Sequence, residues 1–130
     1  MAGMNGRQML VAAILGVILW YVAALLLAWL APMGVLSGSA RVWTYLLIFP
    51  GTLPFVLLMW RATGVARGQL GLAMAIGTTA AMFCDGVALA WFPGLYGGEA
   101  NVAAAGAAIL WGAAVGQVLG MAIAAGSARK

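Results

Sequence analysis

The chain has no histidine, one cysteine and only two acidic residues among its 130 residues. Histidine is the side chain that most often serves as general base or metal ligand near neutral pH, so its absence removes the commonest catalytic chemistry. The single cysteine, Cys84, excludes an intramolecular disulfide. No nucleophile with a matching base, no phosphate-binding loop before a strand and no pair of neighbouring acids takes its place. We therefore expect a protein that is not an enzyme and that has no cofactor or metal.

Charge is scarce throughout. Only 6% of the residues are charged and 66% are hydrophobic, whereas about a quarter of the residues of a typical soluble domain are charged. A soluble protein of this composition would expose large apolar patches and aggregate. The basic residues form no stripe or patch, so no nucleic-acid partner is expected. They lie between or outside the apolar runs, at Arg7, Arg41, Arg61, Arg67, Arg129 and Lys130. The composition indicates an integral membrane protein whose first partner is the lipid bilayer.

Four apolar segments have the roughly 20 residues that a transmembrane helix needs. We predict an all-α fold, a bundle of four transmembrane helices in a single domain, residues 1–130, with helices at about 9–31, 42–60, 69–92 and 101–125. Pro32 and Pro93 should end the first and third helices, because the residue before a proline disfavours the helical conformation. Asn101 is a suitable N-cap for the fourth helix. The first segment is longer than the roughly 7–15 residues of a signal-peptide core, so we interpret it as a retained helix.

The basic residues also predict the orientation. If both termini lie in the cytoplasm, the inner side holds every basic residue except Arg41, as the positive-inside rule requires for short loops. We therefore predict a multi-pass protein of a bacterial inner (plasma) membrane with both termini cytoplasmic. In this arrangement the outer rim carries an interfacial aromatic belt made of Trp29, Trp43, Trp91 and Tyr96.

Asp85 is the one acidic residue inside an apolar segment. It shares a helix face with Ala73, Gly77 and Ala81, because these residues follow one another at intervals of four. An intramembrane carboxyl costs about 2.5–3.5 kcal/mol on insertion scales and should face the bundle interior. Two interpretations stay open: a hydrogen-bonding tie between helices, or a proton or cation site.

Arg41 and Tyr45 begin the second segment at the same predicted outer side as Asp85. A long arginine side chain can extend along the helix toward a buried acid. We therefore expect an intramembrane polar site made of Asp85, Tyr45 and Arg41.

The second segment carries Pro50, Gly51 and Pro54 near its midpoint. Two prolines four residues apart remove two backbone donors and kink a helix. The alternative interpretation is a broken helix whose unwound carbonyls line a site, as in transporters.

The fourth segment repeats small residues every four positions, with Gly112, Gly116 and Gly120 at its centre. Such a stripe lets two helices approach closely in lipid. Its partner is either the small-residue face of the third helix, Gly77 with Ala81, or a helix outside the chain. The second alternative predicts a homodimer or a contact with another membrane protein through the fourth helix.

The stretch Cys84-Asp-Gly-Val-Ala-Leu-Ala-Trp-Phe-Pro-Gly-Leu-Tyr96 resembles a family of small bacterial four-helix membrane proteins of unknown function. In that family an Asp near the end of the third helix precedes an aromatic-Phe-Pro turn. The resemblance implies a fold and a location, and it places emphasis on Asp85, Phe92 and Pro93. The small multidrug resistance transporters share the helix count, but they need a Glu in the first helix, and residues 9–31 contain no acid.

Two functions are compatible with these features. The first is a structural or accessory membrane protein that acts through helix–helix contacts. The second is a small dimeric transporter or channel that uses Asp85 and the proline-broken second helix. A transporter predicts a water-accessible cavity that reaches Asp85 and is lined by Thr52, Tyr45 or Thr78, whereas an accessory protein predicts a dry, packed interior.

Overall fold

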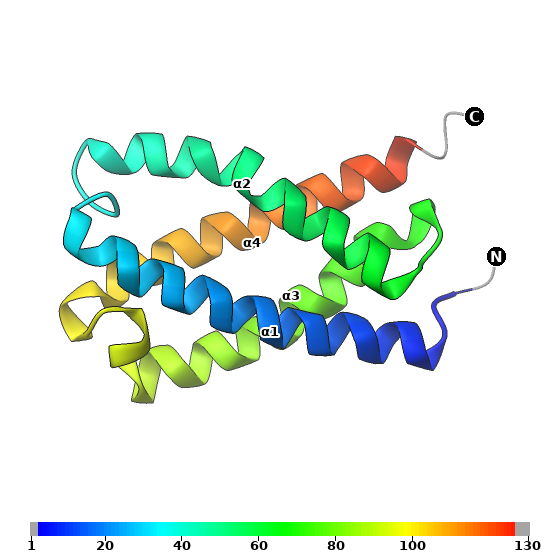
Figure 1. Ribbon diagram of the computed structural model, residues 1–130, viewed down its shortest axis with the longest axis horizontal. Coiled ribbons are helices and arrows are strands. Elements are labelled where there is room, and N and C mark those ends of the chain that lie inside the picture. The colour runs from blue at the N-terminus through cyan, green and yellow to red at the C-terminus, as the bar shows by residue number, and fades with distance from the viewer. Residues whose placement is uncertain (1–2, 127–130) are drawn as a thin grey trace.

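The structure, a computed structural model, describes residues 3–126 and contains four long helices (Figure 1). They are α1 (Gly6–Leu30), α2 (Ala40–Thr63), α3 (Leu70–Trp91) and α4 (Val102–Ala125). Short 3-10 turns complete the connections, and no strand occurs within residues 3–126. Each helix is long and apolar enough to cross a membrane. The predicted all-α fold with four helices is confirmed, and each boundary lies within about one turn of its predicted position.

The helix ends follow local chemistry. Asn5 caps α1 with a capping box, in which its side chain accepts from Gln8 N at 2.8 Å and Gln8 Oε1 accepts from Asn5 N at 3.0 Å. Helix α2 ends at Gly64, whose φ of 64° is a left-handed conformation that glycine adopts without strain. Helix α3 ends before Pro93, as predicted.

The helices alternate in direction, so the bundle has two distinct ends (Figure 1). At one end α1 begins, α2 turns into α3, and α4 finishes. At the other end lie the α1–α2 loop and the α3–α4 turn. The basic residues Arg7, Arg61 and Arg67 belong to the first end, and Arg41 belongs to the second.

The most extensive helix–helix contact is between α1 and α3. Gly16 and Gly77 are both buried, and a Cβ atom added at Gly16 would lie 2.7 Å from Gly77 Cα. Only glycine permits backbones to approach this closely. The small-residue face of α3 therefore packs on α1. Our expectation that Gly77 faces α4 is corrected, because its close neighbours are Met59 of α2 and Ala12 and Gly16 of α1. Helix α3 does pack on α4, as expected, through Met74 against Gly116 and Gly120. Ala81 is half-buried, and its partner helix stays a prediction.

The glycine stripe of α4 is filled by side chains of α2 and α3. Added Cβ atoms would lie 3.9 Å from Ile48 at Gly112, 3.2 Å from Met74 at Gly116 and 2.7 Å from Met74 at Gly120. The stripe is thus used within the chain. The homodimer or partner contact through α4 stays a prediction, and it would have to use residues that remain exposed, such as Leu110, Val118 and Met121.

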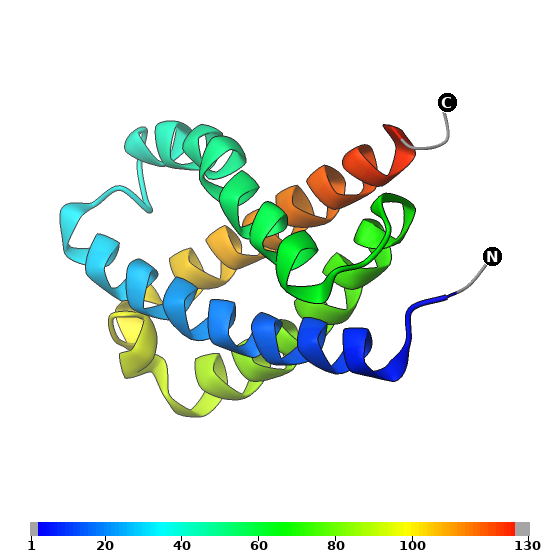
Figure 2. The same cartoon turned by 45° about the vertical axis from the view of Figure 1, so that its right-hand side comes forward.

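Helix α2 is continuous from Ala40 to Thr63 and carries both prolines inside it. It changes direction near its middle (Figure 2), as expected where proline removes a backbone donor and crowds the preceding turn. Pro50, Gly51 and Pro54 are all exposed, and a Cβ added at Gly51 would meet nothing within 4 Å. The alternative of an unwound, site-lining segment is therefore corrected: the helix bends and does not break.

The crossing of α1 and α3 generates the first prediction. Gly16→Ala places a methyl group against the Gly77 backbone, which cannot move aside as a flexible side chain could. We expect this variant to lower the free energy of unfolding by about 1–3 kcal/mol, the usual range for overpacking. The measurement is reversible unfolding in mixed detergent micelles, followed by near-UV circular dichroism.

Gly86→Ala is the matched control, because Gly86 is exposed on α3 and an added Cβ there meets nothing within 4 Å. Its free energy of unfolding should be equal to or higher than that of the unchanged protein, since alanine is the better helix former. Equal losses in the two variants would contradict the close approach of α1 and α3.

Candidate functional site

Asp85 lies in the last two turns of α3 and accepts a hydrogen bond from Tyr96. The Tyr96 hydroxyl donates to Asp85 Oδ1 at 2.5 Å, and the Tyr96 hydroxyl oxygen accepts a hydrogen bond from Trp20 Nε1 at 2.9 Å. Trp20 belongs to α1, and Tyr96 ends the 3-10 turn η3 (Pro93–Tyr96) that follows α3. These three side chains, called here the Asp85 network, connect α1, α3 and the turn before α4 by side-chain hydrogen bonds.

Tyr96 is fully buried, with 0% of its surface exposed. The turn that carries it reverses through Gly97 and Gly98, whose φ angles of 96° and 102° are rarely adopted by residues with a side chain. Asn101 then donates its side-chain Nδ2 to the Tyr96 carbonyl at 2.6 Å. Asn101 occupies the predicted N-cap position of α4, but its side chain makes no capping hydrogen bond. It therefore fixes the turn that directs Tyr96 inward.

The protonation state of Tyr96 follows from its surroundings. Burial raises the pKa of the Tyr96 hydroxyl above its ordinary value of 10.0, and the hydrogen bond to Asp85 raises this pKa further. Both effects disfavour the phenolate, the first by desolvation and the second by stabilising the protonated donor. The hydroxyl therefore keeps its proton at neutral pH and can donate to Asp85.

The predicted polar site of Asp85, Tyr45 and Arg41 is not formed. Arg41 is exposed at the start of α2. The Tyr45 ring stacks on Trp111 of α4 with centroids 5.4 Å apart, and Trp111 Nε1 donates to the Tyr45 carbonyl at 3.0 Å. Within residues 3–126 no basic side chain pairs with Asp85. The expectation fails because the Asp85 face of α3 packs on α1, whereas the start of α2 packs on α4.

Sequence reasoning placed Tyr96 in the aromatic belt and missed its role. The other predicted belt residues, Trp29, Trp43 and Trp91, are indeed 62%, 72% and 72% exposed. A signal for Tyr96 was present, since a tyrosine directly before Gly97-Gly98 can be turned inward. A signal for Trp20 was present too: it occupies the same four-residue spacing as the buried small residues Ala12, Gly16 and Ala24 of α1.

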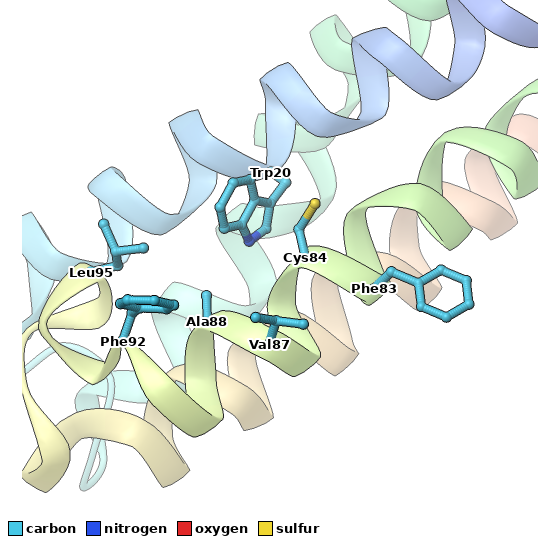
Figure 3. A pocket seen from close by; sticks show the side chains of 7 residues that line it. All are labelled: Trp20, Phe83, Cys84, Val87, Ala88, Phe92 and Leu95. Carbon is cyan, nitrogen blue, oxygen red and sulfur yellow. The ribbon is translucent and has the colours of Figure 1, made fainter.

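An open groove of about 620 Å³ lies beside the Asp85 network on the α1–α3 face (Figure 3). Its lining is apolar and consists of Trp20, Phe83, Cys84, Val87, Ala88, Phe92 and Leu95. Trp20 reaches from α1 toward α3 (Figure 3). Asp85 is not part of the lining, and neither are Thr52, Tyr45 and Thr78, which a transport cavity would have used. In residues 3–126 no group of three Cys, Asp or Glu side chains is placed to hold a metal ion.

Comparisons of the chain with protein-family models, with curated proteins and with solved structures find no match. The resemblance of residues 84–96 to a four-helix family stays a prediction.

The Asp85 network generates the second prediction. Tyr96→Phe keeps the buried ring and removes the hydroxyl that bonds both Trp20 and Asp85. We expect a loss of about 1–2 kcal/mol in the free energy of unfolding, in the range of interhelical hydrogen bonds in membrane proteins. Unfolding followed by tryptophan fluorescence measures it. Tyr21→Phe is the control, because Tyr21 lies on α1 with 48% of its surface exposed. A loss in Tyr21→Phe as large as that in Tyr96→Phe would contradict the assignment.

The third prediction concerns alkaline pH. Because the pKa of folded Tyr96 lies above its unfolded value of 10.0, the unfolded state releases a proton first as pH rises through about 10. The stability that Tyr96 contributes is therefore complete below that pH and is lost above it. We expect the free energy of unfolding to fall more steeply above about pH 10 in the unchanged protein than in Tyr96→Phe. Parallel curves for the two proteins would show that Tyr96 titrates normally.

Proposed function

We propose that this protein is a non-enzymatic, multi-pass membrane protein with a structural or accessory role, which acts through helix–helix contacts in a bacterial inner membrane. The observation that carries the proposal is the hydrogen bond from Tyr96 to Asp85. The one acid within the apolar helices is engaged in holding α1, α3 and the following turn together. A carboxyl group in that position has a structural role in the fold.

The surroundings of Asp85 support the same assignment. The groove beside it has an apolar lining and does not include the carboxyl group. A proton or cation path would need polar groups or water leading to Asp85. The bend in α2 does not support such a path, because Pro50 and Pro54 are exposed on the outside of the bundle and Thr52 lies against Gly116 of α4.

The positions of the basic residues support an orientation with both termini in the cytoplasm. Arg7, Arg61 and Arg67 lie at the end of the bundle where α1 begins and α4 finishes (Figure 1). Arg41 lies at the opposite end. The positive-inside rule assigns the more basic end to the cytoplasmic side.

The fourth prediction tests the proposal against transport. The purified protein is reconstituted in liposomes, and proton and monovalent-cation fluxes are measured under an imposed gradient. We expect fluxes equal to those of protein-free liposomes, both for the unchanged protein and for Asp85→Asn. Asparagine is the suitable replacement because its amide oxygen can still accept a hydrogen bond from the Tyr96 hydroxyl. A flux that requires Asp85 would overturn the proposal in favour of a small transporter.

A second arm of this experiment seeks the contacts directly. A photoreactive side chain replaces Leu47 of α2, Phe83 of α3 or Leu110 of α4, which are 66%, 76% and 65% exposed. After illumination of native membranes we expect at least one position to give a protein adduct of a single defined mass. The same group at the buried Val56 should give none. Lipid adducts alone at all three exposed positions would contradict a role through helix contacts.

A further inference from the structure

A second hollow, of about 310 Å³, lies between the start of α1 and the end of α2. It is more enclosed and far more polar than the groove beside Asp85. Arg7 and Gln8 line it from α1, and Arg61 lines it from α2. Both helices are candidate membrane spans that begin or finish here. The hollow therefore lies at the level where a span meets the membrane surface.

The walls of the hollow are fixed by hydrogen bonds within the protein. Gln8 Nε2 donates to the Gly64 carbonyl at 3.4 Å, which joins the start of α1 to the end of α2. Thr63 donates its hydroxyl to the Met59 carbonyl at 2.7 Å. These polar groups of the lining are thereby occupied, and they shape the hollow without being its binding groups.

The two arginines are the groups left to bind a ligand. Neither Arg7 nor Arg61 makes a hydrogen bond or ion pair with another residue of the range 3–126. Arg67, at the same end of the bundle, is different because its Nε donates to the Ile123 carbonyl at 2.8 Å. The two acids of the chain, Asp85 and Glu99, belong to the second half of α3 and to the turn before α4. No carboxylate in the lining competes for the two guanidinium groups.

The chemistry of the hollow fits a phosphate group. Guanidinium groups bind phosphate oxygens through paired hydrogen bonds, and two of them from different helices can neutralise one phosphate. The start of α1 adds the positive end of a helix dipole on the same side. Basic pockets between transmembrane helices on the cytoplasmic side bind anionic lipid head groups in this way.

The surface next to the hollow indicates that the phosphate belongs to a lipid. On α1, Leu10 and Ile14 lie three and seven residues after Arg7, and therefore on its face. On α2, Leu57 and Leu58 precede Arg61 by one turn. All four leucine and isoleucine side chains are between 45% and 60% exposed. An apolar track thus leads from the arginines along both helices, as acyl chains below a head group require.

We propose that this hollow binds the phosphate of an anionic phospholipid, with Arg7 and Arg61 as the binding residues. The lipid then lies against α1 and α2 at the basic end of the bundle. This inference concerns a different surface from the Asp85 network, so its failure would leave the proposed function standing.

The fifth prediction is the test of this site. The full chain is titrated in detergent with phosphatidylglycerol or phosphatidylcholine, and bound lipids are counted by native mass spectrometry. Phosphatidylcholine is the matched lipid, because it carries the same phosphate beside a compensating cation. We expect preferential binding of phosphatidylglycerol, weakened roughly tenfold in Arg7→Gln and in Arg61→Gln, as loss of a charge-assisted hydrogen bond implies. The affinity of Arg61→Lys for phosphatidylglycerol should lie between those of the unchanged protein and Arg61→Gln, since lysine keeps the charge and loses the paired hydrogen-bond geometry.

Arg41→Gln is the control, because it removes one exposed arginine at the opposite end of the bundle. It should bind phosphatidylglycerol as the unchanged protein does. An equal loss in Arg41→Gln would show a general effect of net charge and overturn the site. Displacement of the lipid by an excess of orthophosphate would make the hollow a site for free phosphate and overturn the lipid assignment. Near-UV circular dichroism confirms that each variant is folded.

Discussion

The close approach of α1 and α3 at Gly16 and Gly77 is the constraint on which the rest of the structure depends. The two helices run in the same direction and cross (Figure 1). The distance between them therefore grows from the crossing toward their C-terminal ends. Trp20 lies one turn beyond Gly16, and Asp85 lies two turns beyond Gly77. A large indole can bridge that widening space, and Tyr96 fills the remainder by bonding both side chains. The Asp85 network is thus a consequence of where two glycines permit the backbones to meet.

The existence, type and approximate bounds of the helices could be predicted from the sequence. A bilayer sets the length of an apolar segment, and a proline or glycine ends it at a definite residue. The basic loops and the inward-facing acid followed from the same physics. Such features depend on one segment at a time and on whether lipid or water surrounds it. They need no knowledge of which helix lies next to which.

The pairing of the helices could not be predicted from the sequence. The residues that surround Asp85 were therefore predicted wrongly as well. Small-residue stripes occur in α1, α3 and α4 alike, and lipid supplies no hydrophobic drive to choose between them. The choice rests on the fit of particular side chains, such as Met74 against Gly116 and Gly120. Tyr45 and Arg41 were expected near Asp85 only because they lie at a similar depth in the membrane. Residues at the same depth can lie on opposite sides of a bundle. Tyr96 was missed because a two-glycine turn reverses a side chain that its depth would place at the surface.

The Asp85 network also limits what Asp85 can do. A carboxyl group in a membrane helix costs about 2.5–3.5 kcal/mol to insert, and its hydrogen bond to Tyr96 offsets part of that cost. The same bond closes the turn between α3 and α4, since Tyr96 is held there by Asn101. Displacing Tyr96 from Asp85 Oδ1 would also loosen the contact between α1 and that turn, because the same hydroxyl accepts from Trp20. An acid that serves transport has to change partners readily, whereas this acid has partners on which the fold relies. The geometry therefore favours a carboxyl that selects one arrangement of helices over its alternatives.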